Sequence, residues 1–288
     1  MPVRSAKPRH RVRRLSSWTE FRELVTGGAY ATWAFRGQHD AALPLSTSLY
    51  RHLAAFGVDR RAWAHQEERI ARIFRRKAHN YLRHVPPPDD HFQWQALIEH
   101  HGGPTRLLDF TWSPWVAAFF ALQSATHDSA VWAVDPAAVL RIARRVAGGG
   151  RSLPADRIDP RHPENYRRHF QASRRAFAWI GEPETMNARL VAQSGTFAMT
   201  SIIDRTLEDI LGAHDPACVV ELVLPARLRD SGLRELYVMN ITHATLFPDL
   251  DGLARSLAYE LEFHWAFDPR TMRALGKVPR PYRELASD

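Results

Sequence analysis

The densest group of polar side chains in this sequence lies between His100 and Pro114. Two imidazoles, one guanidinium, one carboxylate and three hydroxyls fall within these fifteen residues. A Gly-Gly-Pro break lies near the start of the segment, and an apolar stretch follows at residues 114–122. A segment that serves only as core has no need of so many polar groups, whereas a pocket for a polar, phosphate-bearing ligand does.

The pattern predicts a short strand over residues 105–110 and a buried helix over residues 114–122. Thr111 and Ser113 precede that helix and are suited to cap its N-terminus, a position that also favours an anion. Two roles are open for Asp109: it caps the helix or holds an arginine, or it acts directly in chemistry. His100 and His101 are adjacent and point in different directions, and two histidines alone are weak evidence for zinc.

A second group, residues 35–40, reads Phe-Arg-Gly-Gln-His-Asp at the end of a predicted strand. The guanidinium of Arg36 is a planar, permanently charged fork that suits a phosphate or a carboxylate. Gly37 would let a ligand approach the backbone closely. The alternative is that Arg36 pairs with a buried carboxylate such as Asp109 and serves only the fold.

A third group surrounds Gln193 and Ser194, which precede Gly195 at the start of a predicted strand. The amide of Gln193 either faces a cleft or makes a cross-strand hydrogen bond. In the segment 245–252, Asp249 and Asp251 lack the further acids of a calcium loop, so we expect a turn and a helix cap.

Short strands and helices alternate along the chain without the spacing of parallel βαβ units, which predicts an α+β fold. The GxGxxG, P-loop, GxSxG and HExxH patterns are all absent. We expect a single domain over residues 16–268, between a disordered basic tail at 1–15 and a basic C-terminal tail at 269–288. Strands are predicted at 33–37, 105–110, 130–134, 191–199, 219–224 and 236–239, the longest helix at 60–84, and a mobile loop at 147–165.

The chain has 288 residues, a net charge of +8 and one cysteine, Cys218, which we expect to be a buried strand thiol. No apolar run reaches the roughly 20 residues that span a bilayer, and no signal sequence is evident, so a cytoplasmic protein is expected. The basic N-terminal tail either contacts nucleic acid, with strong salt dependence, or is simply solvated. Its charged residues are Arg4, Lys7, Arg9, Arg11, Arg13 and Arg14, with His10.

Several of these segments, taken in order, resemble the FRG domain family, which is named for its Phe-Arg-Gly. They are Phe35-Arg36-Gly37, Leu49-Tyr50-Arg51, the segment from His100 to Pro114, and Ala117 to Ala121. The segments 189–197 and 246–252 also resemble the C-terminal part of such proteins, so the resemblance spans about residues 18–260.

The order of features is further similar to that of ADP-ribosyltransferases, which implies a split β-sheet with helical insertions and NAD as the substrate. Arg36, Asp109 and Gln193 would then be catalytic, although those enzymes carry a glutamate where this chain has Gln193. Catalysis would therefore need another acid, which could be Asp109, Glu68, Glu182 or Glu184. The implied NAD-binding residues are Arg36, Gly37, Gln38, His101, Thr105, Arg106 and Ser113. The resemblance implies a transferase or NAD glycohydrolase, such as a bacterial toxin or phage-defence effector. The alternative is a non-catalytic module that binds a nucleotide or nucleic acid.

Overall fold

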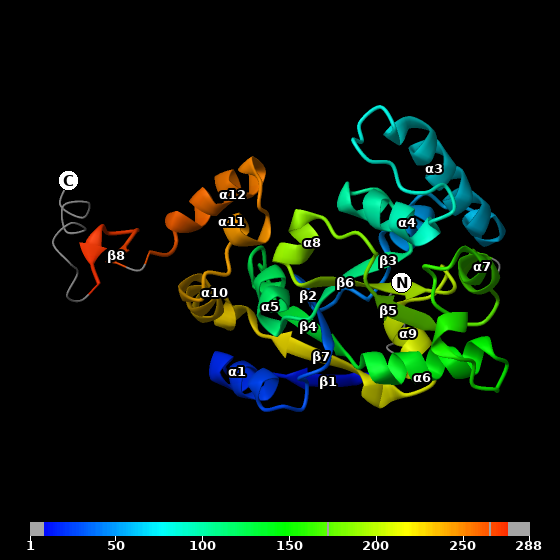
Figure 1. Ribbon diagram of the computed structural model, residues 1–288. Coiled ribbons are helices and arrows are strands. Elements are labelled where there is room, and N and C mark those ends of the chain that lie inside the picture. Colours follow the sequence, from blue (N-terminus) through cyan, green and yellow to red (C-terminus); the bar gives the residue numbers. More distant parts are fainter. Residues whose placement is uncertain (1–8, 172, 265, 276–288) are drawn as a thin grey trace.

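A seven-stranded mixed β-sheet forms the centre of the molecule in the computed structural model, which describes residues 9–171, 173–264 and 266–275 (Figure 1). The strand order is β1-β7-β4-β2-β3-β6-β5, with β1 parallel to β7 and the other neighbours antiparallel. The strands are β1 (Arg11–Arg14), β2 (Ala34–Gln38), β3 (Leu107–Thr111), β4 (Ser129–Val134), β5 (Ala178–Gly181), β6 (Gly195–Thr200) and β7 (Val219–Leu224). With helices on both faces, this is the α+β fold that the sequence predicts.

The sheet is weakly joined between β2 and β3. These two strands share a single register pair, Phe35 with Thr111. By contrast, β2 pairs with β4 over five residues, and β3 pairs with β6 over five. The strands therefore diverge on one side of the Phe35–Thr111 pair, and the sheet opens there into two halves.

One face of the sheet is covered by α5 (Pro114–Leu122), α1 (Trp18–Thr26) and α10 (Arg229–Val238). The sequence of α5 is apolar all round because the helix is buried between β2 and these neighbours. It comes so close to β2 that a Cβ atom at Gly37 would overlap the carbonyl oxygen of Ala117. Glycine is thus required at this position by helix packing.

The other face carries α6 (Pro136–Ala147) and α9 (Leu207–Gly212), which lie near one end of the sheet (Figure 1). A third apolar cluster lies beneath α4 (His91–His100) and α7 (Pro163–Tyr166). The remaining helices are α2 (Ser48–Ala55), α3 (Trp63–Ala78), α8 (Ala188–Ala192), α11 (His243–Leu246) and α12 (Leu250–Glu260), with short turns η1 to η5 and a hairpin of β8 (Phe267–Asp268) and β9 (Arg273–Ala274). Within the described part of the chain, none of the helices is both long and apolar enough to cross a bilayer.

Polar side chains begin many of these helices, as the sequence suggests. Ser113 accepts a hydrogen bond from the backbone nitrogen of Val116 and starts α5, and Asp249 accepts one from Gly252 and starts α12. Such caps satisfy backbone donors that the first helical turn leaves free. The expected cap roles of Ser113 and Asp249 are therefore confirmed.

Four predicted elements are wrong in type or extent. Residues 236–238 are the end of α10 rather than a strand, and the strand predicted at 191–199 begins only at Gly195, after α8. The helix predicted at 60–84 is limited to Trp63–Ala78, and short helices interrupt the loop predicted at 147–165. The apolar patterns at 191–199 and 236–239 were compatible with both helix and strand, and packing in three dimensions decided between them. The loop was predicted from its glycines and prolines, which do not exclude short helices such as α7, where Pro163 is the first helical residue.

The basic tail is also shorter than predicted. Residues Arg11–Arg14 form the edge strand β1, where Arg13 pairs with Glu20 and Arg14 with Asp128. Backbone pairing with β7 orders these arginines even though their side chains are exposed. Residues 1–8 and 276–288 lie outside the described residues. Cys218 is buried one residue before β7, and burial raises the pKa of its thiol to about 12.

Among the described residues, the most deeply buried charge is Arg106, whose side chain is 1% exposed. It donates to both carboxylate oxygens of Glu67 on α3, and also to the carbonyl oxygens of Phe170, Thr200 and Ser201. The pair joins α3 to the residue just before β3 and to the loop after β6. A guanidinium is tolerated in the core because its donors are matched in this way.

Replacing Arg106 by methionine should therefore lower the free energy of unfolding by about 3–5 kcal/mol, because Glu67 would remain buried without its counter-charge. Urea denaturation followed by circular dichroism measures this loss. The control is Arg13→Met, which removes the exposed pair with Glu20 and should cost at most about 1 kcal/mol. Equal losses in the two variants would contradict a core role for Arg106.

Candidate functional site

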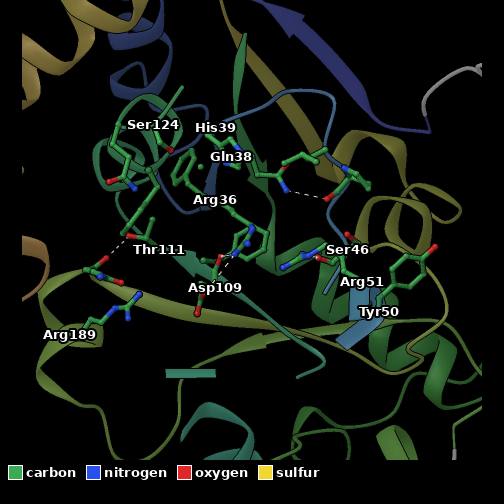
Figure 2. Close-up of a pocket in the computed structure, with 18 of the residues that line it drawn as sticks. Arg36, Gln38, His39, Ser46, Tyr50, Arg51, Asp109, Thr111, Ser124 and Arg189 are labelled. Carbon is green, nitrogen blue, oxygen red and sulfur yellow. Dashed lines mark hydrogen bonds and ion pairs between the residues drawn. The ribbon is translucent and has the colours of Figure 1, made fainter. Parts of the chain in front are cut away.

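A cavity of about 690 Å³ opens where β2 and β3 diverge (Figure 2). Its walls come from β2, α2, β3, α5 and α8, so segments far apart in the sequence meet there. It is lined by Phe35, Arg36, Gly37, Gln38, His39, Leu43, Pro44, Ser46, Tyr50, Arg51, Ala54, Asp109, Phe110, Thr111, Phe120, Gln123, Ser124, Arg189 and Gln193. This volume is in the range of small-molecule and cofactor sites.

Arg36 spans the opening between the two halves of the sheet. Its Nη1 donates to the carbonyl oxygen of Asp109 at 2.6 Å and lies 4.0 Å from the Asp109 carboxylate. The Arg36 side chain is 20% exposed, whereas that of Asp109 is 58% exposed. The guanidinium is thus held in place by backbone, and the carboxylate beside it remains accessible from the cavity.

Two further arginines line the same cavity. Arg51, on α2, donates to the carbonyl oxygen of Ser46, and burial together with the charge of Arg36 lowers its pKa. Arg189, on α8, lies over the ring of Phe247 at 4.6 Å from the ring centre. Figure 2 shows these three guanidinium groups around Asp109. Three guanidinium groups against one lining carboxylate leave an excess of positive charge that suits an anionic ligand.

Glu99 lies behind this cluster, in the last turn of α4. Its carboxylate accepts hydrogen bonds from the hydroxyls of Thr105 and Ser48. Burial, and then the negative charge of Asp109, raises the pKa of Glu99 to about 7, against the opposing effect of Arg36. Near neutral pH, Glu99 therefore exists in both protonated and ionised forms, and its charge is tied to that of Asp109.

Sequence reasoning missed Glu99. The signal was its place in the last turn of a predicted helix, directly before the polar segment at 100–114. That position alone does not reveal the partial burial of Glu99, which arises because Ser48 of α2 and Thr105, just before β3, lie against its carboxylate. Tyr50 and Arg51 were singled out as part of a family pattern, and both line the cavity.

The cavity also has flat apolar surfaces. Phe35, Tyr50 and Phe120 line it, and Tyr50 is braced by the edge of the Trp63 ring at 5.5 Å. Aromatic faces of this kind can stack on a heterocyclic ring. Gln38, by contrast, is engaged at both ends: its amide donates to the carbonyl oxygen of Pro44, and its oxygen accepts from the indole of Trp132.

Five of the predicted site residues line this cavity, and four do not. Arg36, Gly37, Gln38, Asp109 and Gln193 line it. The prediction that His101, Thr105, Arg106 and Ser113 face the same pocket is not met by the structure. Arg106 is buried against Glu67, Thr105 is buried against Glu99, Ser113 caps α5, and His101 is an exposed residue at the end of α4.

The alternation of side chains along β3 explains why only some residues of the polar segment reach the cavity. In a strand, successive side chains point to opposite faces, so Asp109 is exposed while its neighbours Leu108 and Phe110 are buried. Arg106 precedes the strand and turns toward α3 instead. The polar segment at 100–114 therefore contributes to the cavity mainly through Asp109 and Thr111.

Gln193 is the residue after α8, two positions before β6, rather than the first residue of a strand. Its side-chain amide donates to the carbonyl oxygen of Leu246 at 3.0 Å, and its own backbone carbonyl oxygen accepts from the hydroxyl of Thr111 at 2.7 Å. Ser194, which follows, has a positive φ of 45° that turns the chain into β6. Gln193 thus joins α11 and β3 at the cavity wall.

Residues 31–130 match the family model of the FRG domain. The matched part runs from just before β2 into β4 and includes Arg36, Arg51, Glu99 and Asp109. Gln193 and Arg189 lie beyond it. No curated protein and no protein of known structure matches the chain.

The raised pKa of Glu99 predicts a pH-dependent stability. A carboxyl group that holds its proton more tightly in the folded state stabilises the fold fully below its unfolded pKa of 4.5, and this contribution is lost as pH rises through about 7. The contribution of Glu99 to the free energy of unfolding should therefore fall between about pH 5 and 7. Histidines whose pKa is lowered by burial, such as His91 and His100, contribute with the opposite sign in the same range, so the effect of Glu99 is measured as a difference from the wild type. In urea titrations at several pH values, the free energy of unfolding of Glu99→Gln should have a more positive slope against pH than that of the wild type, because the falling contribution of Glu99 is removed.

The matched control is Glu23→Gln on the exposed side of α1, which should keep the wild-type slope. A Glu99→Gln variant with an unchanged slope would show that another group causes the pH dependence.

Proposed function

We propose that this chain, which carries an FRG domain over residues 31–130, binds NAD in the cavity and cleaves the bond between nicotinamide and ribose. The observation that carries the proposal is the set of three arginines around one accessible carboxylate. The carboxylate of Asp109 is 58% exposed and lies 4.0 Å from Arg36, so it is open to a ligand that the guanidinium groups bind. A site for glycosidic cleavage in a phosphate-bearing substrate needs both kinds of group.

The arginines supply the binding of the pyrophosphate. Arg36 is held by the carbonyl oxygen of Asp109, and Arg51 by that of Ser46, so both are oriented before a ligand arrives. Guanidinium groups bind phosphate oxygens through paired, charge-assisted hydrogen bonds. Preorganised donors of this type lose little conformational entropy on binding.

The aromatic side chains supply the binding of the rings. Phe120 comes from α5 and Tyr50 from α2, and both side chains are partly exposed, whereas Phe35 of β2 is buried in the core. A dinucleotide presents two flat heterocycles separated by a pyrophosphate, and the cavity offers apolar faces on either side of its arginines. The volume of about 690 Å³ is compatible with a ligand of this size.

Asp109 supplies the electrostatic part of the chemistry. As the glycosidic bond breaks, its electron pair leaves with nicotinamide, and positive charge develops on the ribose ring. A fixed carboxylate beside that ring stabilises the charge in the transition state. An oxygen of water or of another acceptor then forms a bond to the same carbon and releases its proton, for which Asp109 is the accessible base.

The order of the strands supports the same proposal. Arg36 lies on β2, Thr111 on β3 and Gln193 just before β6, and these three strands are neighbours in the sheet. The resemblance to ADP-ribosyltransferases requires its three sequence segments to meet at one site. In this chain the corresponding segments line one cavity.

One observation favours a second function, a module that binds a nucleotide without turning it over. The third segment carries Gln193 where the enzymes carry a glutamate, and its amide is engaged with the carbonyl oxygen of Leu246. An amide bears no charge to stabilise a developing cation. On this alternative, Asp109 would only position Arg36.

The test is incubation of the purified chain with NAD and chromatographic measurement of released nicotinamide. Asp109→Asn should lower the rate by about 100-fold or more, as expected when a charge that stabilises the transition state is removed. Arg36→Ala should abolish turnover and weaken NAD binding in calorimetry. The matched control is Asp251→Asn, an exposed residue of α12, which should keep the wild-type rate.

Each outcome separates the two functions. Binding of NAD with no release of nicotinamide would overturn catalysis and leave the binding module. Neither binding nor turnover by folded wild-type protein would overturn both. An Asp109→Asn variant with wild-type turnover would show that the carboxylate has no part in the chemistry.

A further inference from the structure

Two basic hollows lie on either side of the glycine turn at residues 148–150, away from the residues that line the NAD cavity. The first has a volume of about 760 Å³ and the second about 460 Å³. The first is lined by Arg141, Ile142, Arg144, Arg145, Val146, Gly150, Ser152, Ala213 and His214. The second is lined by Ala147, Gly148, Leu153, Arg168, His169, Ser173, Arg174, Arg175 and Phe177.

The arginines come from two elements that are distant in the sequence. Arg141, Arg144 and Arg145 lie on the last two turns of α6. Their counterparts in the second hollow follow α7, in and after the π-helical turn at Arg167–Gln171. Together the two hollows present six guanidinium groups, and among the described residues that line them there is no carboxylate.

Arg175 lies against the glycine turn between the two hollows. Its guanidinium donates to the carbonyl oxygen of Ala147 at the end of α6. The same group lies against Gly149, where an added Cβ atom would come within 2.9 Å of its nitrogen. The arginine therefore crosses the turn that separates the hollows.

The start of β1 extends this surface on the other side. A Cβ atom at Gly212 would overlap the carbonyl oxygen of Arg9, so the chain at Arg9 lies against the end of α9. Ala213 and His214, which follow at once, form the wall of the first hollow. Arg9 is exposed and adds positive charge beside these residues.

We propose that this double hollow binds the sugar-phosphate backbone of a nucleic acid. Arginines placed on both sides of a turn match a ligand with repeated phosphates better than a single small anion. The lining offers guanidinium groups and few aromatic faces, so it would bind the phosphates of the backbone and would not distinguish one base from another. Asp215, beside His214, is a nearby carboxylate, but its oxygen accepts from the backbone nitrogen of Ala217.

The exposed face of α3 is a second basic region and provides the comparison. It carries Arg69, Arg72, Arg76 and Lys77 at its surface, but Glu68 lies among them. The hollows differ because they are concave and their lining lacks acids. A convex helix with mixed charges is the common form of a solvated surface.

The experiment measures binding of fluorescently labelled 20-base-pair DNA and RNA duplexes by anisotropy at several salt concentrations. The full chain should bind at least one duplex, and the variant Arg141→Ala, Arg145→Ala, Arg168→Ala, Arg174→Ala should bind about tenfold more weakly or worse at 100 mM salt. Its log-log salt slope on DNA should fall by about 0.9 for each phosphate that the variant no longer neutralises. The control variant neutralises Arg69, Arg72, Arg76 and Lys77, with the same reduction in net charge, and should retain most of the affinity.

Equal weakening in the two quadruple variants would overturn the proposal, since net charge alone would then explain binding. Absence of duplex binding by the wild type, or equally strong binding to anionic phospholipid vesicles that the hollow variant loses in parallel, would also overturn it. Thermal melts establish that each variant is folded. Arg36→Ala should leave duplex affinity unchanged, and the hollow variant should still consume NAD, so failure of one proposal is distinguishable from failure of the other.

Discussion

The candidate site depends on the hydrogen bond from Arg36 to the carbonyl oxygen of Asp109, which links β2 to β3 where the two strands diverge. Here β2 and β3 have separated after a single register pair, so a ladder of backbone hydrogen bonds no longer joins them. An arginine side chain reaches across the gap instead. The separation makes room for a ligand, and the same interaction fixes a charged group at its edge. Because α5 packs tightly against Gly37, the strand β2 cannot shift to close the gap.

Charge balance around this gap connects the cavity to the rest of the fold. Three arginines line the cavity, while Asp109 within it and Glu99 behind it supply the negative charges. Burial of Glu99 keeps it partly protonated near neutral pH, so the positive potential of the cavity is greater than a count of residues suggests. Arg106, which sequence reasoning assigned to the ligand, instead joins α3 to the sheet through Glu67. Within the polar segment, Arg106 therefore stabilises the fold, whereas Asp109, three residues later, lines the cavity.

The chain separates its basic residues into groups with different surroundings. In the cavity, Arg36 and Arg51 donate to backbone carbonyl oxygens and Arg189 lies over the ring of Phe247. Arg13 and Arg14 of β1 pair with surface carboxylates, and the arginines beside the glycine turn line hollows without acids. An overall charge of +8 describes none of these groups by itself. What each arginine can bind depends on how many of its N–H donors are already hydrogen-bonded to neighbouring residues.

Local sequence patterns were enough to establish the α+β class, the strands around Arg36 and Asp109, the caps at Ser113 and Asp249, and the buried helix of residues 114–122. These features depend on apolar and capping residues, which act over a few positions along the chain. Packing in three dimensions was needed to establish that Arg106 turns into the core, that Glu99 is partly buried behind the cavity, and that residues 236–238 are helical. The side chains of residues 100–114 point to different faces of the structure. Their contacts are therefore made with elements that are distant in the sequence, such as α2, α3 and β2.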